Sequence, residues 1–343
     1  MATIKEIAKR AGVSTATVSY VLNGTKKIST ETISRVNEAI KELNYAPNTI
    51  AMNLRKGKTC TIGVITEDLR CFPTPEILNG IGEALEDANY QMVVHDLHLY
   101  GKIWPDYTKI DKYKARIDKG VQVLRQSMVS GIIYVCMHDR ELSHLIEPLD
   151  IPLVYAYSNC TSDESYITYD DFNSGKNMVQ HLIDLGHRDI AVIGGYHHSY
   201  VTQLRLNGAK LALKENGLKL PEEYIKYGDF EYHSGYEMTL ELLRLKNPPT
   251  AIFAMNDIMA AGSYKACSEL NIRIPEDISI VGYDNRDISR YLNPSLTTMG
   301  LPLQDIGKQA LTVLLDSIND EKTSPKQAIL PCQIITRSSA RKL

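Results

Sequence analysis

Apolar residues near the start of the chain recur at the three- and four-residue spacing of an amphipathic helix. The first run begins after Thr3, which forms a capping box with Glu6, and Gly12 fits the left-handed residue that often ends a helix. Ser14 is a favoured N-cap for a second run. The pattern therefore predicts two short helices joined by a tight turn, a helix-turn-helix. Residues that the second helix turns outward are candidate DNA contacts: Thr15, Ala16, Thr17, Ser19, Tyr20 and Asn23.

A third helical run follows, capped by Ser29 and stopped near Asn44 and Pro47. Its apolar face is expected to complete a small core through Ile33, Val36, Ile40 and Leu43. Residues 48–58 have no core of their own, so they connect this head to the rest of the chain.

From Thr61 onward the pattern changes, and short β-rich runs alternate with amphipathic helices. Strands are expected at 62–65, 91–94, 131–135 and 153–157, and again at 189–193, 224–227, 251–255 and 278–283. Helices are expected near 76–89, 112–128, 203–216, 234–245 and 257–270. The last helix, near 302–318, and strands around 329–336 are expected to return across the interface between the two halves. Such alternation predicts an α/β body of two parallel-sheet lobes, with a ligand cleft at the carboxyl ends of the strands.

Charge divides the chain at the same place. The chain of 343 residues has a net charge of −3, yet residues 1–58 carry ten Lys and Arg against four Asp and Glu, a net of +6. The remaining residues carry 28 against 37, a net of −9. A basic head on an acidic body is typical of a DNA-binding unit, whose phosphate contacts make affinity fall steeply with salt.

Composition excludes several other classes. No N-terminal apolar run resembles a signal peptide and none spans a bilayer, so a cytoplasmic protein with no membrane partner is expected. The six cysteines form no CxxC pair and are expected to be reduced structural thiols. They are Cys60, Cys71, Cys136, Cys160, Cys267 and Cys332.

The sequence shows no catalytic set. Asn79-Gly80-Ile81-Gly82 lacks the third glycine of a dinucleotide fingerprint and falls inside a predicted helix. His95 and His98 are a lone pair without further spaced ligands, as expected of surface histidines. We therefore expect neither an enzyme nor a protein that holds a cofactor or a metal.

Short motifs in both parts of the chain are typical of one family. In the head they are Thr-Ile-Lys-Glu-Ile-Ala at 3–8, Ser-Thr-Ala-Thr-Val-Ser at 14–19, Val-Leu-Asn-Gly at 21–24 and Tyr-Ala-Pro-Asn at 45–48. In the second lobe they lie at 186–195, 205–208, 251–257, 275–284 and 296–299. On these motifs the chain resembles the lac repressor family of bacterial transcription regulators. The resemblance implies a helix-turn-helix headpiece at 1–46, a hinge helix or linker at 47–58, and a periplasmic-binding-protein-like effector-binding and dimerisation domain at 59–343.

By this resemblance, base readout falls to Thr15, Ala16 and Tyr20, while Thr3, Thr17, Ser19 and Asn23 hold phosphates. Leu54 occupies the place of a leucine that the family pushes between base pairs of the minor groove. Arg55 or Lys56 would replace a minor-groove cation that the chain lacks, because Met52 stands where family members commonly have Arg. One headpiece reads one half-site, so a two-fold dimer on a pseudo-palindromic double-stranded operator is expected. The sequence ends without a leucine-heptad tail, which favours a homodimer over a tetramer.

The resemblance also nominates residues for a small-molecule effector site. Asp284 ends a buried strand and can accept hydrogen bonds from a diol, and Arg205 can donate in fork geometry. Asn256 can donate and accept, and Phe230 matches a position that stacks on a sugar or purine ring. Alternatively, Asp284 and Asn256 cap the helices that follow them, and Phe230 belongs to the core.

The first lobe departs from the family pattern. Its first loop, which contains Phe72, lacks the usual Asn-Pro-aromatic-aromatic run, and Tyr157 replaces a common Asp. Both are candidate ligand contacts. Residues 98–110, with the only tryptophan, are an apparent insertion that either closes the cleft or covers a lobe surface. We predict a repressor controlled by a carbohydrate effector. A purine-type metabolite and a phosphorylated carrier-protein corepressor are the alternatives.

Overall fold

The computed structural model describes residues 2–23, 26–45, 59–104, 106–143, 145–161, 163–320 and 324–343. The chain divides into two compact units, Met1–Thr59 and Cys60–Leu343, and each is described by itself. Most of the proposed hinge, including Leu54 and Arg55, lies outside the described residues.

The first unit contains three helices among its described residues: α1 (Ile4–Ala11), α2 (Thr15–Asn23) and α3 (Thr30–Glu42). The capping box is confirmed, because Glu6 N donates to Thr3 Oγ1 at 3.3 Å and Thr3 N donates to Glu6 Oε2 at 2.7 Å. Gly12 ends α1 with a φ of 65°, in the left-handed conformation that the sequence predicted. The helices surround a small core of Ile7, Ala8, Ala11, Val18, Val36 and Ala39.

One head prediction is wrong. Ile33 is 36% exposed and is not part of this core. It lies in the first turn of α3, whereas the buried contacts of that helix begin at Val36. Ile40 and Leu43 pack against the core from its edge, as partly buried residues.

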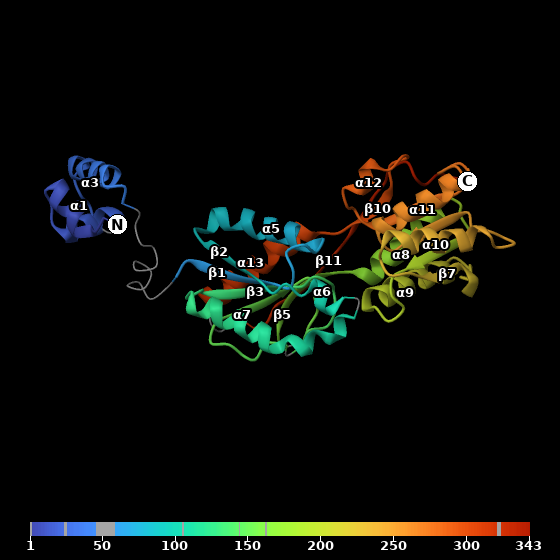
Figure 1. Ribbon diagram of the computed structural model, residues 1–343, viewed down its shortest axis with the longest axis horizontal. Helices are drawn as coiled ribbons and strands as arrows, with labels where there is room; N and C mark the ends of the chain where they lie inside the picture. Colours follow the sequence, from blue (N-terminus) through green and yellow to red (C-terminus); the bar gives the residue numbers. More distant parts are fainter. Residues whose placement is uncertain are drawn as a thin grey trace. The chain divides into compact units, whose positions relative to one another are not determined.

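The second unit has two sheets of six strands each within the described residues (Figure 1). The first lobe has the order β11-β5-β4-β3-β1-β2, and all of its strands are parallel. Its strands are β1 (Thr61–Thr66), β2 (Gln91–Asp96), β3 (Gly131–Val135), β4 (Leu153–Ala156), β5 (Ser165–Tyr169) and β11 (Gln327–Leu330). Its helices are α5 (Pro73–Ala88), α6 (Tyr100–Ile103), the 3₁₀ helix η1 (Tyr107–Tyr113), α7 (Lys114–Gln126) and α13 (Leu303–Asn319).

The second lobe has the order β12-β10-β9-β8-β6-β7, in which only the β10–β12 pair is antiparallel. Its strands are β6 (Ile190–Gly194), β7 (Ile225–Tyr227), β8 (Ala251–Ala254), β9 (Ser279–Asp284), β10 (Thr297–Gly300) and β12 (Gln333–Ile335). Its helices are α8 (Asp171–Asp184), α9 (Tyr200–Glu215), the 3₁₀ helix η2 (Glu222–Tyr224), α10 (Tyr232–Leu243), α11 (Asp257–Glu269) and α12 (Ile288–Tyr291).

The chain crosses between the lobes three times in the part that the structure describes: after β5, after β10 and between β11 and β12. The predicted return of the C-terminal segment is therefore confirmed, with α13 and β11 in the first lobe and β12 in the second. The sequence pattern did not predict β5 or β10. Both are short and come directly before a crossing, so they lack a following helix in their own lobe to mark them.

Close helix packing depends on glycines. A Cβ on Gly80 of α5 would collide with the backbone of Gln304 in α13, so Gly80 lets these two helices lie side by side (Figure 1). The glycine at position 80 is therefore explained by helix packing, and no phosphate-binding site is needed to account for it. Likewise, a Cβ on Gly208 of α9 would collide with the Phe172 carbonyl of α8. The close approach of α8 and α9 brings Arg205 against Asp171.

All six cysteines are free, as the sequence predicted. Of the described helices, none is long and apolar enough to cross a membrane.

Candidate effector site and DNA-binding face

The predicted DNA contacts lie on α2 and at the start of α1. Thr15 and Ala16 are exposed, Thr17, Ser19 and Tyr20 are half-buried, and the intervening Val18 is buried in the core. The Ser14 hydroxyl accepts from Thr17 N at 3.1 Å and so caps α2. Thr3 is exposed, but its hydroxyl already serves the capping box. Nothing is described of the side chain of Asn23.

The predicted ligand contacts meet at one cavity of about 350 Å³ in the second unit. All six line it: Asp284, Arg205, Asn256, Phe230, Tyr157 and Phe72. Tyr157 and Phe72 belong to the first lobe and the other four to the second. Asp284 ends β9, Tyr157 directly follows β4 and Asn256 follows β8. The cavity therefore lies at the carboxyl ends of parallel strands, where ligands bind in open α/β sheets.

Three of these residues have a left-handed backbone. The φ angle is 65° at Tyr157, 68° at Phe230 and 102° at Asp284. Residues other than glycine rarely adopt such angles, which cost about 1–3 kcal/mol each and cluster at functional sites. The presence of all three in the lining of one cavity supports the interpretation of that cavity as a binding site.

Asp284 offers a carboxylate to this cavity. Within the described part of the chain its one charged contact is Arg286, whose Nε lies 3.6 Å from Asp284 Oδ2, beyond hydrogen-bonding distance. Burial raises the pKa of Asp284 to about 6, although Arg286 and Arg205 oppose the rise. A buried carboxylate without hydrogen bonds of its own is poised to accept them from a ligand.

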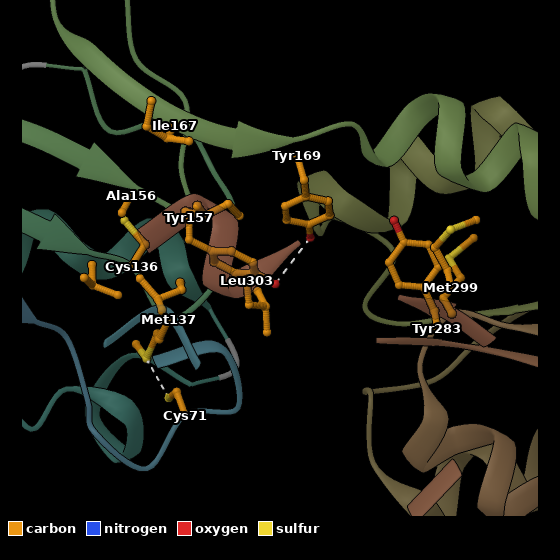
Figure 2. Packing of buried hydrophobic residues seen from close by; sticks show 14 of the residues in the cluster. Cys71, Cys136, Met137, Ala156, Tyr157, Ile167, Tyr169, Tyr283, Met299 and Leu303 are labelled. Atoms are coloured by element: carbon orange, nitrogen blue, oxygen red, sulfur yellow. Dashed lines mark hydrogen bonds between the residues drawn. The ribbon is translucent and has the colours of Figure 1, made fainter. Parts of the chain in front are cut away.

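Arg205 is buried and makes hydrogen bonds within the second lobe and to the first. Its Nε donates to Asp171 Oδ1 at 2.6 Å and its Nη1 to the Met255 carbonyl at 2.6 Å. Its Nη2 donates to the hydroxyl of Tyr169, in the first lobe, at 3.1 Å. The Tyr169 ring stacks on Tyr157, with centroids 5.2 Å apart (Figure 2). Three of the five guanidinium N–H groups are thus used, and the others remain for a ligand.

Asn256 serves as a helix cap, as the alternative reading anticipated. Its Oδ1 accepts from Met259 N at 2.7 Å, and its Nδ2 donates to the Phe230 carbonyl at 2.8 Å. The second bond fixes the loop that carries Phe230, so Asn256 shapes the cavity wall through its neighbour.

Comparisons with known proteins agree with this architecture. Residues 3–48 match the model of the bacterial regulatory proteins of the lacI family, and residues 179–340 match a periplasmic binding protein-like domain. The HTH-type transcriptional repressor PurR of Klebsiella pneumoniae is 34% identical, over 99% of this chain and 97% of its own. PurR of Proteus mirabilis is 35% identical with the same coverage. The chain belongs to the lacI family.

Solved structures of the family share the fold. The lac repressor dimer bound to operator and the anti-inducer ONPF superimposes with a TM-score of 0.82 at 27% identity, over 99% of both chains. The complex of the transcriptional regulator CelR with cellobiose gives a TM-score of 0.66 at 28% identity, over 99% of this chain and 100% of CelR. As a lacI family member the protein is a DNA-binding transcription regulator and not an enzyme, as the sequence predicted.

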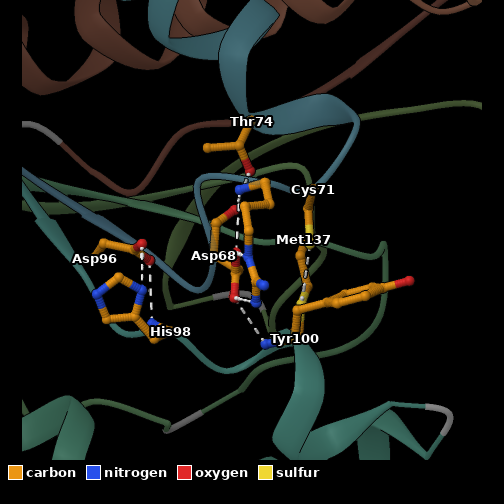
Figure 3. Close-up of polar contacts among 8 residues, drawn as sticks. Asp68, Cys71, Thr74, Asp96, His98, Tyr100 and Met137 are labelled. Atoms are coloured by element: carbon orange, nitrogen blue, oxygen red, sulfur yellow. Dashed lines mark hydrogen bonds and ion pairs between the residues drawn. The ribbon is translucent and has the colours of Figure 1, made fainter.

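The described residues of segment 98–110, the apparent insertion, form a wall of the cavity in this lacI family member. Tyr100, Trp104 and Tyr107 all line it. Trp104 reaches the second lobe, where its ring meets Tyr196 edge-on with centroids 5.6 Å apart. The insertion is fixed at its start by the buried Asp68, which accepts from Tyr100 N at 3.1 Å (Figure 3).

Asp68 is itself held as an anion. The guanidinium of Arg70 donates to both of its oxygens, at 2.9 and 3.0 Å, and these bonds lower the pKa of Asp68 to about 2. Nearby, His98 pairs with Asp96 at 2.8 Å (Figure 3), and the His98 side chain is 67% exposed. It is therefore a surface histidine, and no cluster of metal ligands occurs among the described residues.

Sequence reasoning missed Arg286. Its guanidinium, from the second lobe, lies 4.2 Å from the ring centroid of Phe72 in the first lobe, a cation–π contact across the cavity. Arg286 follows Asp284 by two residues, and that proximity to a nominated carboxylate was the available signal. Its partner Phe72 is distant in sequence and could not be paired without the lobe arrangement.

Proposed function

We propose that this regulator is a repressor that binds a pseudo-palindromic operator as a homodimer, and that a sugar in the 350 Å³ cavity changes its operator affinity. Residues 1–46 would be the headpiece, 47–58 the hinge with Leu54 and Arg55 at the minor groove, and 59–343 the effector and dimerisation domain. Such a protein acts in the cytoplasm, on double-stranded DNA.

The observation that carries the sugar proposal is the Asp284 carboxylate among aromatic rings. Two oxygens without hydrogen bonds can accept from neighbouring hydroxyls, and Phe72 and Phe230 supply apolar faces for a ring. Two of the three arginines in the wall are already paired, Arg205 with Asp171 and Arg70 with Asp68. These pairings favour an uncharged effector over a phosphorylated one.

A purine is the second candidate effector, because relatives at 34–35% identity carry the name PurR. A flat base between Phe72 and Phe230 would also suit the cavity. The tryptophan Trp104 is the only one in the chain, and it lines this cavity, so its fluorescence can report binding. Titration with a panel of sugars and with hypoxanthine separates the two classes. A response to hypoxanthine alone would replace the sugar proposal with the purine one.

Coupling to DNA would work through lobe closure. Contacts that join the lobes around the cavity include Arg205 with Tyr169, Arg286 with Phe72, Trp104 with Tyr196, and His138 Nε2 with Ser199 Oγ at 3.2 Å. A ligand that prefers one lobe arrangement shifts the population toward it, and the effect of DNA on ligand affinity must then be equal.

The DNA-binding proposal is tested by selecting sites from fragmented genomic DNA with the full-length protein at near-physiological salt. We expect an enriched pseudo-palindrome. We also expect affinity for it to fall by roughly 10³–10⁵ between about 50 and 200 mM salt if the dimer makes about 6–10 phosphate contacts. Salt-sensitive binding without any enriched site would contradict sequence-specific regulation.

Effector affinity is expected to depend on pH. Because the pKa of Asp284 is raised to about 6 and a hydroxyl ligand needs the ionised form, affinity should be constant above that pH. Below it, affinity should fall roughly tenfold per pH unit as the carboxyl takes up a proton. Trp104 fluorescence titrations from about pH 5 to 8 measure this, and the Asp284→Asn protein should show a flat profile. A flat profile for the unmodified protein would remove Asp284 from the site.

A further inference from the structure

A second cavity, of about 840 Å³, lies beside the first. The insertion lines it through η1, the first lobe through the loop after β3, and the second lobe through the residues before α9. The predicted ligand residues do not line it. A sugar confined to the 350 Å³ cavity would therefore leave this second cavity empty.

Tyr107 and His138 belong to the walls of both cavities. Their rings are stacked, with centroids 4.2 Å apart and planes 12° from parallel. Burial lowers the pKa of His138 to about 3, so the imidazole is neutral at ordinary pH. The two cavities thus share the uncharged ring pair of Tyr107 and His138 in their walls. A ligand that extends past this ring pair would occupy both cavities.

The lining of the second cavity has the chemistry of a sugar site. Tyr196 and Tyr200 contribute aromatic rings to the lining, and Glu141 and Asp111 contribute carboxylate acceptors. Its cations Arg140 and Lys114 are already engaged.

Arg140 Nη2 donates to the buried Glu67 at 2.5 Å. Lys114 Nζ donates to the Leu145 carbonyl at 3.1 Å and also lies 3.7 Å from Asp118. Committed cations beside further carboxylates disfavour a phosphate or another anion. The cavity suits a neutral unit with several hydroxyls.

We infer that the second cavity is a subsite for a second sugar unit, so that the effector is an oligosaccharide of at least two rings. The inference rests on the proposed carbohydrate effector. The first unit would meet Asp284, Phe72 and Phe230, and the second would lie beyond Tyr107 and His138, against Tyr200.

The test compares monosaccharides with disaccharides on the full-length protein, using Trp104 fluorescence. The probes are glucose, galactose and mannose, the disaccharides cellobiose, maltose, lactose and melibiose, and hypoxanthine. We expect at least one disaccharide to bind about tenfold or more tightly than any monosaccharide, because it buries a second ring.

Variants assign the extra affinity to the second cavity. Tyr200→Ala should weaken the preferred disaccharide about tenfold and leave monosaccharide affinity unchanged, since a ring contact contributes on that order. Tyr200→Phe keeps the ring and should retain affinity. Tyr232→Ala is the matched control, because both tyrosines are 44% exposed and begin a helix, whereas Tyr232 lines neither cavity.

The outcomes are distinguishable. If monosaccharides bind as tightly as every disaccharide, or if Tyr200→Ala lowers affinity for both kinds equally, the second subsite is refuted while the carbohydrate effector stands. If hypoxanthine alone binds, or no sugar does, the carbohydrate effector and the subsite fall together.

Discussion

A protein carrying Asp284→Asn is expected to bind operator DNA normally and to lose most of its response to the effector. Hydrogen bonds to a charged group contribute about 1.5–3 kcal/mol each, so weakening two of them lowers effector affinity roughly a hundredfold or more. Asparagine keeps the size of the side chain and tolerates the left-handed backbone at φ 102°, which alanine does not. Asp284→Ala should lose the response too, with added backbone strain.

Two titrations measure this effect: Trp104 fluorescence for the effector, and operator binding with and without saturating effector. Asp287→Asn is the control, because Asp287 is exposed three residues further on and does not line the cavity. An Asp284→Asn protein that responds at unchanged effector concentration would remove this carboxylate from the site. Loss of operator binding without effector would instead mean that Asp284 maintains the structure.

The sequence predicted the place of the site better than its internal contacts. Asp284, Tyr157 and Asn256 come at or just after strand ends, and the carboxyl ends of parallel strands meet at one edge of a sheet. Their common cavity therefore follows from local pattern and topology. The side chain of Asn256 hydrogen-bonds to Met259 and to Phe230 instead of remaining available to a ligand. This could not be predicted, because the bond to Phe230 depends on the loop after β7, and tertiary packing sets the path of that loop.

Contacts between the lobes could not be predicted from the sequence either, because they also depend on tertiary packing. Arg205 meets Tyr169, and Arg286 meets Phe72, only because three crossings fix the lobes against each other. The insertion at 98–110 left two readings open. The hydrogen bond from Tyr100 N to Asp68 and the ring contact between Trp104 and Tyr196 hold this segment at the cavity and not on an outer surface of the lobe.

The second large effect is expected from a substitution in the core of the head, because that core is small. Ile7→Ala removes a fully buried side chain from a core of six buried residues, at a cost of about 2–5 kcal/mol. A unit of this size rarely gains more than about 3–5 kcal/mol from its core. We therefore expect the head to unfold and operator affinity to fall by roughly a hundredfold or more.

Effector binding should survive this change, because the chain divides into two compact units and the cavity lies wholly in the second. Operator binding and Trp104 titration on the same preparation separate the two effects. Ile33→Ala is the matched control: the same atoms are removed from α3, where the side chain is 36% exposed, and the expected cost is within about 0.5 kcal/mol. Equal loss of operator binding in both variants would show that Ile33 acts at the DNA or at a partner. Loss of effector binding in Ile7→Ala would show that the second unit needs a folded head.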